Sequence, residues 1–212
     1  MLRWIAAVLA SMLCAGCSSS NQAKKQEPAP ALKDEPTPEL FKVRFETNKG
    51  PVVVEIHRDW APKGVDHFYM LVKTHFYDGN RFFRAVRNSI VQFGINGDPQ
   101  TNRLWSTTNI SDDPVKQKNI KGTLTFATTG PTGRSTQLFF NLRDNRALDK
   151  QGFEPIGTVV SGMDTVQMLY SAYGDWPPGG QGPDPRKIET QGNDYLTSQF
   201  PRLDYIRKAT VE

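Results

Sequence analysis

The stretch from residue 82 to residue 94 reads FFRAVRNSIVQFG and holds two apolar runs on either side of a polar turn. It carries Arg84 and Gln92, which are eight positions apart. A straight strand would separate them by about 26 Å, because a strand rises roughly 3.3 Å per residue. A hairpin that turns at Asn88 places them side by side instead. An arginine and an amide that lie side by side above an apolar surface can bind the carbonyl of a peptide, while an apolar side chain of that peptide packs on the surface.

Alternation of apolar and polar residues predicts a mainly β domain with short strands. The predicted strands are 41–47, 52–56, 81–86, 90–94, 123–127, 138–142, 155–160 and 203–211. One helix is expected to start at Pro62 with Asp59 as its cap. A second is expected from Ser161, which forms a capping-box pattern with Asp164, to Tyr173. Many short strands with two helices indicate a β-barrel or a sandwich, and periodicity does not choose between them.

Two further blocks of sequence follow the first one. Residues 122–141 read GTLTFATTGPTGRSTQLFFN, and residues 148–164 read LDKQGFEPIGTVVSGMD. The order and spacing of the three blocks resemble the cyclophilin family of peptidyl-prolyl cis-trans isomerases, from about Phe41 to the C-terminus. The resemblance implies a closed antiparallel β-barrel of eight strands with a helix covering each end. It also implies a functional groove on the outer surface of the barrel.

The reaction that the resemblance implies is the cis-trans isomerisation of an X–Pro peptide bond. It is slow because amide resonance must be broken, which gives a rotation barrier of roughly 18–20 kcal/mol. The resemblance places Arg84 at the family's catalytic arginine. A guanidinium is always charged and offers several donors, so it can favour the twisted amide over the planar one. Gln92 matches the glutamine that hydrogen-bonds the substrate backbone, and Phe139 matches the aromatic floor of the proline pocket. This chemistry needs no metal ion and no cofactor, and none is expected.

Four further positions match parts of the family's substrate site. Ile90 stands where the family usually has Met, and Leu148 matches a leucine at the pocket edge. Ala127 and Thr128 match the short segment that contacts the peptide through its backbone. For Phe139 and Leu148, plain core packing is the alternative interpretation.

Several positions of the expected site depart from the family pattern. Phe83 stands where many members have His, and Ser89 replaces a Phe that forms a major wall of the proline pocket. Ala147 stands where animal members have Trp, and Phe153 replaces a His that lines the groove. Losing an aromatic wall removes on the order of 1.5–3 kcal/mol of apolar contact. We therefore expect a shallower pocket, with weakened or narrowed activity.

The N-terminus predicts export. Arg3 precedes the apolar run 5–13, which is too short for a transmembrane helix of roughly 20 residues. The sequence CAGC that ends at Cys17 resembles a bacterial lipobox, although Leu13 lies one residue farther from Cys17 than that motif usually places it. Cys17 would be the single cysteine left after cleavage, so we expect residues 1–17 to be a lipoprotein signal with lipidation at Cys17. An ordinary cleaved signal is the alternative.

Residues 18–40 are rich in Ser, Pro, Lys and Glu, a composition that does not bury a core, so they are expected to form a disordered tether. Residues 41–212 then form one cyclophilin-like domain. Ser18 after the lipobox favours the outer membrane. We therefore expect a lipid-anchored protein of the cell envelope that faces the periplasm.

The net charge of +4 is spread along the chain without a basic run, so nucleic acid is not an expected partner. The Gly- and Pro-rich segment 174–185 lacks the Lys-Ser/Thr of a phosphate loop and is expected to be a surface loop. The expected partners of this monomer are proline-containing segments of unfolded or exported proteins. Two other functions stay open. One is a non-catalytic peptide-binding module on the same barrel, favoured by Ser89, and the other is a structural envelope lipoprotein.

Overall fold

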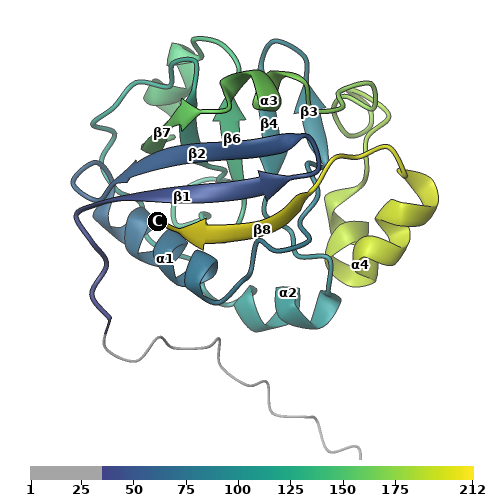
Figure 1. Ribbon diagram of the computed structural model, residues 1–212, viewed down its shortest axis with the longest axis horizontal. Helices are drawn as coiled ribbons and strands as arrows, with labels where there is room; N and C mark the ends of the chain where they lie inside the picture. Colours follow the sequence, from purple (N-terminus) through teal and green to yellow (C-terminus); the bar gives the residue numbers. More distant parts are fainter. Residues whose placement is uncertain (1–34) are drawn as a thin grey trace, which may run out of the picture.

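The computed structural model describes residues 35–212. The predicted signal, Cys17 and most of the predicted tether lie outside the described residues. The described part contains one sheet of eight antiparallel strands in the order β3-β4-β6-β5-β7-β2-β1-β8, which curls around a core (Figure 1). The strands are β1 Leu40–Thr47, β2 Gly50–His57, β3 Arg84–Val86, β4 Ile90–Phe93, β5 Thr123–Phe126, β6 Leu138–Asn141, β7 Pro155–Ser161 and β8 Ile206–Val211.

The curled sheet is open between its edge strands β3 and β8, so the expectation of a closed barrel is wrong. The residue segments just before β3 and just before β8 pair with each other at one isolated β-bridge, between Arg81 and Tyr205. Phe82 N donates to Asp204 O at 3.0 Å beside that bridge. In the antiparallel register of that bridge, the partners of β8 would be residues 75–80, and the seam stays open because residues 74–79 form turns after α1 instead of a strand.

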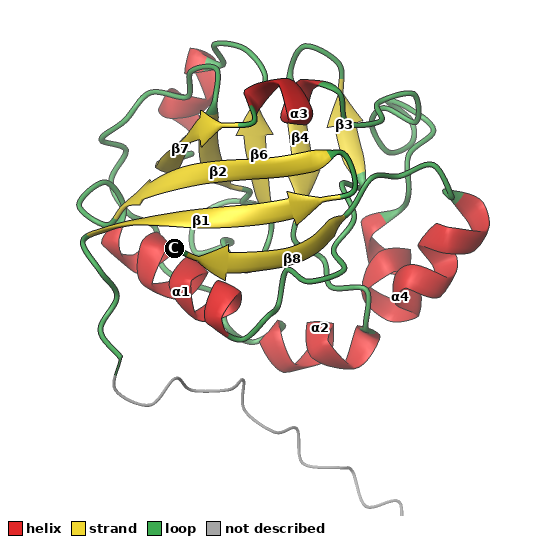
Figure 2. Cartoon of the chain, in the orientation of Figure 1, coloured by secondary structure: helices red, strands yellow, loops and turns green. Residues whose placement is uncertain are grey.

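One helix of the expected pair, the one that starts at Pro62, is confirmed, but the described part has more helices than the two expected. There are four α-helices and one 3-10 helix in residues 35–212 (Figure 2). They are α1 Pro62–Lys73, α2 Pro99–Trp105, the 3-10 helix η1 Arg146–Gln151, α3 Met163–Gln167 and α4 Pro185–Gln199. In Figure 1, α1 and α2 lie below β8, and α4 lies beside the end of the sheet that holds β3.

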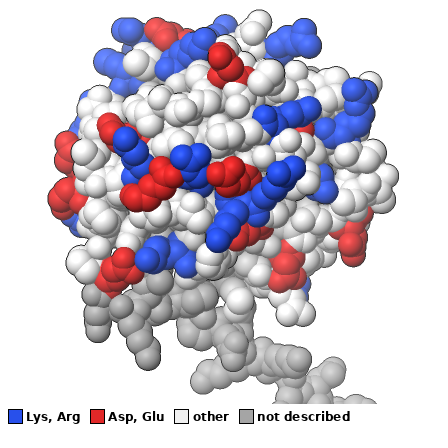
Figure 3. All heavy atoms as spheres, viewed as in Figure 1, with Lys and Arg blue, Asp and Glu red and all other residues white. Residues whose placement is uncertain are grey.

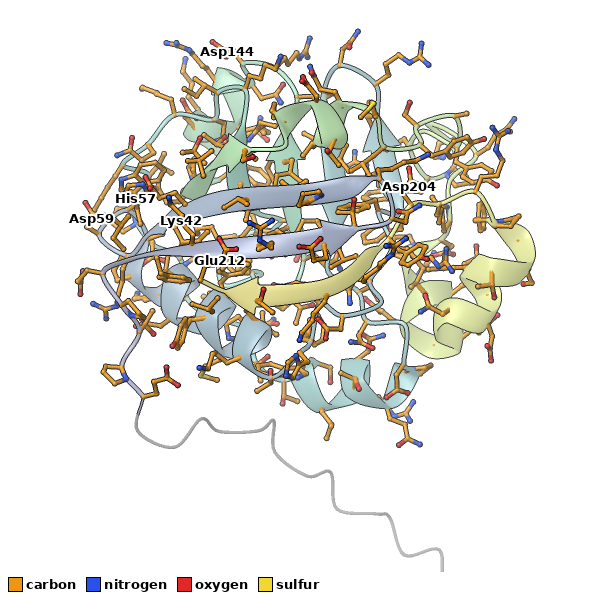
Figure 4. All side chains as sticks on the ribbon, viewed as in Figure 1. Lys42, His57, Asp59, Asp144, Asp204 and Glu212 are labelled. Carbon is orange, nitrogen blue, oxygen red and sulfur yellow. The ribbon has the colours of Figure 1, made fainter. Side chains whose placement is uncertain are left out.

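The helix expected from Ser161 to Tyr173 has only five residues, and its N-cap is Gly162 instead of Ser161. It ends early because the chain turns toward the start of β8, where Tyr170 N donates to Asp204 Oδ2 at 2.7 Å. Oδ1 of the same carboxylate accepts from Asn48 Nδ2 at 2.7 Å. Asp204 therefore joins three segments at the point where the chain enters β8 (Figure 4).

The N-terminus of α1 is also capped differently from the prediction. Its N-cap is Ala61, without a side-chain hydrogen bond, and not Asp59. The carboxylate of Asp113, from a distant loop, accepts from Lys63 N at 3.2 Å and Gly64 N at 2.9 Å. It thereby satisfies two N–H groups that a helix start leaves without intrahelical partners.

The core inside the curled sheet is rich in aromatic side chains. Phe93 stacks on Phe140 with ring centroids 5.5 Å apart, and Phe45 meets Phe93 edge-on at 5.6 Å. A second, smaller cluster attaches α4 to the side of the sheet; its buried members are Phe83, Ile95, Ile188, Tyr195, Leu196 and Leu203. The strand that carries Arg84 therefore lies between two apolar clusters.

The face formed by β1, β2 and β8 carries mixed charge. Basic and acidic side chains alternate on it without a single-sign patch (Figure 3). Arg44 on β1 pairs with Glu46 and with Glu212, and Glu212 lies beside Lys42 at the end of β8 (Figure 4). Glu35, within the segment predicted as a tether, accepts from Tyr69 Oη on α1 at 2.6 Å. Within residues 35–212, no helix has the length and apolarity that crossing a membrane requires.

Candidate active site

A two-strand hairpin places Arg84 directly opposite Gln92. The register of β3 and β4 pairs these two residues, and the turn between them holds Asn88 at a φ of 54°. Ser89 N closes the turn on Val86 O at 3.0 Å. The Nη1 atom of Arg84 donates to Oε1 of Gln92 at 3.0 Å. The predicted hairpin is therefore confirmed, and its two polar side chains are in contact.

Gln92 is held from its other side as well. Its Nε2 donates to Oε1 of Gln137 at 2.9 Å, so both ends of the Gln92 amide have a protein partner. Across β4 and β6, Gln92 lies opposite Phe139. The ring of Phe139 is buried and meets the ring of Phe153 edge-on at 5.8 Å. A fixed amide thus lies beside a fixed aromatic ring.

Strand alternation decides which side of the sheet carries this set. The neighbours Ala85, Val91 and Phe140 belong to the core, so Arg84 and Phe139 project from the opposite face. The site therefore lies on the outer surface of the curled sheet, as the resemblance implied.

A groove of about 910 Å³ opens at this outer surface. It brings together nine of the ten predicted catalytic and substrate-binding residues: Arg84, Ser89, Ile90, Gln92, Ala127, Thr128, Phe139, Ala147 and Leu148. Phe83 is the exception, because it is 1% exposed and packs in the second cluster against α4. Successive side chains of an extended chain point to opposite sides, so Phe83, next to Arg84, points away from the groove.

One end of the groove is formed by the loop after β6 and by η1. Its polar residues are Arg143, Asp144, Asn145 and Arg146, and Figure 4 marks the place of Asp144. Asn145 Nδ2 donates to Ser89 O at 3.0 Å and to Asn141 Oδ1 at 2.7 Å. These bonds fix the backbone of Ser89 at the edge of the groove.

Sequence reasoning missed two residues that contact Arg84 directly. Asp175 Oδ1 accepts from Arg84 Nε at 2.7 Å, and Oδ2 accepts from Arg84 Nη2 at 2.9 Å. The ring of Trp176 lies 4.2 Å from the guanidinium carbon. Both residues belong to the segment that was expected to be a surface loop, and no motif in the sequence marks them as partners of Arg84.

The ionic state of this cluster follows from these contacts. The hydrogen bond from Arg84 holds the pKa of the Asp175 carboxyl below its usual value, so Asp175 is a carboxylate near neutral pH. Among residues 35–212, no three His, Cys, Asp or Glu side chains gather as a metal site would require. Around Arg84, the groups that the groove offers to a ligand include an arginine, an amide and aromatic rings.

An arginine and a glutamine beside a buried aromatic ring, on the outside of a curled antiparallel sheet, define the cyclophilin class of protein. The sequence matches the family described as "Cyclophilin type peptidyl-prolyl cis-trans isomerase/CLD" over residues 42–185, and the chain belongs to this family. The chain is therefore a member of a family of isomerases.

Relatives with this name occur in bacteria and fungi. A peptidyl-prolyl cis-trans isomerase of Acinetobacter baylyi is 31% identical over 60% of this chain and 70% of its own length. The isomerase ppi1 of Schizosaccharomyces pombe is 29% identical over 61% of this chain and 85% of its own length. An isomerase-like 2 protein of Gibberella zeae is 30% identical, but this chain spans only 22% of it.

Solved structures agree with the fold. A cyclophilin-type isomerase from Cryptosporidium parvum has a TM-score of 0.57 at 18% identity and covers 82% of this chain and 98% of its own. The same protein in the presence of the dipeptide Ala-Pro has a TM-score of 0.56. The cyclophilin AquaCyp293 from Hirschia baltica has a TM-score of 0.54.

Proposed function

We propose that this chain is an active peptidyl-prolyl cis-trans isomerase that binds X–Pro segments in the groove around Arg84. The observation that carries the proposal is the contact of Arg84 with Gln92, opposite the buried ring of Phe139. An always-charged donor, a fixed amide and an apolar floor are the three groups that the reaction requires. They lie within one groove.

In the proposed mechanism, the proline ring of the substrate packs on Phe139 and the preceding backbone is bound by Gln92. Arg84 donates toward the prolyl amide as that amide twists and loses its resonance. A planar amide nitrogen accepts a hydrogen bond poorly and a pyramidal one accepts it well, so this contact is stronger in the transition state than in the ground state. The isomerisation breaks no covalent bond and transfers no proton.

The test is a proline-isomerisation assay on a panel of X–Pro peptides. Arg84→Ala is expected to lower kcat/KM at least about tenfold, which corresponds to roughly 1.4 kcal/mol of transition-state stabilisation. Arg84→Lys keeps the charge but loses the planar fork, and is expected to lose most of the activity too.

Arg87→Ala is the matched control. Arg87 is an exposed arginine in the same hairpin turn, and it does not line the groove. Its removal is expected to leave kcat/KM unchanged. Equal activity of Arg84→Ala and Arg87→Ala, with both proteins folded, would contradict the proposed role of Arg84.

The second candidate function is a peptide-binding module without catalysis. It is favoured by Ser89, which lies at the groove where the family pattern has a phenylalanine wall. The same assay separates the two functions: a protein that binds X–Pro peptides but does not accelerate their isomerisation is the module.

The proposed setting of this activity is the cell envelope. The lipobox-like sequence at Cys17 and the Pro-rich segment after it support a lipid-anchored isomerase that faces the periplasm, and its proposed state is a monomer. Its proposed substrates are proline-containing segments of exported proteins, which fold in that compartment.

A further inference from the structure

The Gly- and Pro-rich loop that follows α3 is folded tightly onto Asp175. Gly182 N donates to Asp175 O at 2.8 Å, and Gly180 N donates to Trp176 O at 3.1 Å. A Cβ atom at Gly180 would lie 2.2 Å from Asp175 O, so only glycine fits at this position. Ala85 N, on β3, donates to Gly174 O at 3.3 Å and joins the loop to the strand that carries Arg84.

This loop holds Arg84 on two sides. The carboxylate of Asp175 accepts hydrogen bonds from Nε and from Nη2 of the guanidinium, which is the bidentate geometry that favours arginine–carboxylate pairs. The ring of Trp176 covers the guanidinium at 4.2 Å and packs on the second apolar cluster. The side chains of Arg84 and Asp175 are 23% and 27% exposed, so water screens this ion pair only in part.

The held guanidinium keeps donors for a substrate. Arginine has five N–H groups, and Asp175 and Gln92 occupy three of those of Arg84. One N–H on Nη1 and one on Nη2 remain. Arg84 lines the groove together with Trp176, so its two remaining N–H donors lie at the proposed substrate site.

We infer that Asp175 is a positioning residue for the isomerase reaction, and that it orients the guanidinium of Arg84 toward the groove with Trp176 stacked on it. An arginine side chain loses rotamer freedom when it is fixed, and this loss opposes the ordering of a free guanidinium at the moment of reaction. The loop supplies this ordering before the substrate binds. A preoriented donor stabilises the twisted amide without reorganisation at the moment of reaction. The inference rests on the proposed function of Arg84.

The main test compares steady-state kinetics of full-length wild type, Asp175→Asn, Asp175→Ala and Asp175→Glu on one X–Pro peptide. Asp175→Ala is expected to lower kcat at least about fivefold with KM changed less than about twofold, because a preoriented donor acts mainly in the transition state. Asp175→Asn is expected to lower kcat less. Asp175→Glu, which can form the two-bond contact again, is expected to recover at least half of the wild-type kcat.

The matched control is Asp164→Asn, which removes the same charge from an exposed carboxylate on α3. It is expected to keep wild-type kinetics. Trp176→Phe is expected to keep most of the activity because it keeps an aromatic face, and Trp176→Ala is expected to lower kcat.

A spectroscopic readout tests the contact independently of activity. In wild type, the Arg84 Nε–H proton is expected to give a slowly exchanging NMR signal that shifts or disappears in Asp175→Asn. Thermal unfolding of each variant establishes that it is folded.

The outcomes separate the two proposals. An active wild type that loses activity in Arg84→Ala but keeps its kcat in folded Asp175→Ala overturns the inference and leaves the proposed function in place. A rise of kcat in Asp175→Ala also overturns the inference, because Asp175 would then compete with the substrate for Arg84. An inactive wild type overturns the proposed function, and the inference with it.

Discussion

Arg134 and Asp113 form an ion pair that is shielded from solvent: Nη2 of Arg134 lies 3.0 Å from Oδ2 of Asp113, and the two side chains are 2% and 1% exposed. The same carboxylate accepts from the first N–H groups of α1, at Lys63 and Gly64. Asp113 therefore neutralises a buried cation and caps a helix at the same time.

Asp113→Ala is expected to lower the free energy of unfolding by about 3 kcal/mol or more, because it leaves Arg134 buried without its closest counter-charge. Urea denaturation measures this loss. The control is Asp112→Ala: Asp112 Oδ1 lies 3.4 Å from Arg134 Nε, but its side chain is 40% exposed. That change is expected to cost less than about 1 kcal/mol. Equal losses in the two variants would contradict the assigned role of Asp113.

Glu154 is buried, and burial raises the pKa of its carboxyl to about 7. Its two oxygens accept from Lys116 N at 2.5 Å and Gln117 N at 3.2 Å. Between pH 4.5 and 7 the folded protein holds this proton more tightly than the unfolded chain, so the contribution of Glu154 to stability is full below pH 4.5 and is lost as the pH rises to about 7. The expected loss is on the order of 3 kcal/mol.

Glu154→Gln, which does not titrate, is expected to remove this part of the pH dependence when unfolding free energies at pH 5 and pH 8 are compared. His67 adds the opposite slope, since burial lowers its pKa to about 4 and its contribution is lost as the pH falls from 6.5 toward 4. The measured quantity is therefore the difference between wild type and Glu154→Gln at each pH. A constant difference would show that Glu154 is ionised in the folded protein at both values.

Ser89→Phe tests the predicted weakness of the proline pocket. The backbone of Ser89 is fixed by bonds to Leu142 N and Asn145 Nδ2, so a larger side chain at this position would start from the edge of the groove. Added apolar contact with the proline ring is expected to raise kcat/KM severalfold. Ser89→Ala is the control and is expected to stay near wild type. No rise in Ser89→Phe would contradict the prediction that the pocket lacks a wall at Ser89.

Cys17→Ser tests the proposed lipid anchor. A serine hydroxyl does not replace the thiol that receives the lipid, so the variant is expected to remain unprocessed or to become soluble. The measurement is fractionation of cell membranes after a salt wash. A variant that stays with the membranes as wild type does would contradict lipidation at Cys17.

The local sequence pattern was enough to predict the hairpin of the site, because its residues are close together in the sequence. The turn at Asn88 and the apolar runs beside it were sufficient to place Arg84 opposite Gln92. The family resemblance supplied Phe139 and Leu148, which come from other strands and loops. Phe83 was misplaced because the resemblance assigned it to the groove, whereas the period of two along β3 turns it the other way.

Other features depend on contacts between distant segments. Asp175 lies 91 positions from Arg84, and nothing in the sequence around Asp175 indicates a partner. The helix predicted to start at Pro62 is confirmed as α1, whereas α4 was not predicted and α3 is shorter than predicted. α4 is a mostly polar helix interrupted at Gly192, so its apolar periodicity is weak, although Asp184 and Pro185 give an ordinary start signal. α3 ends early because Asp204, in another segment, binds Tyr170 N.

Because the sheet is open at β3, the outer edge of this strand contacts a loop instead of another strand, and this loop can vary in sequence. β3 is an edge strand of three residues, and its outer side is contacted by the loop that carries Asp175 and Trp176. Loops tolerate substitution and insertion better than the strands of a packed core do. New substrate preferences can therefore arise through changes in this loop, while the eight strands and their aromatic interior stay as they are.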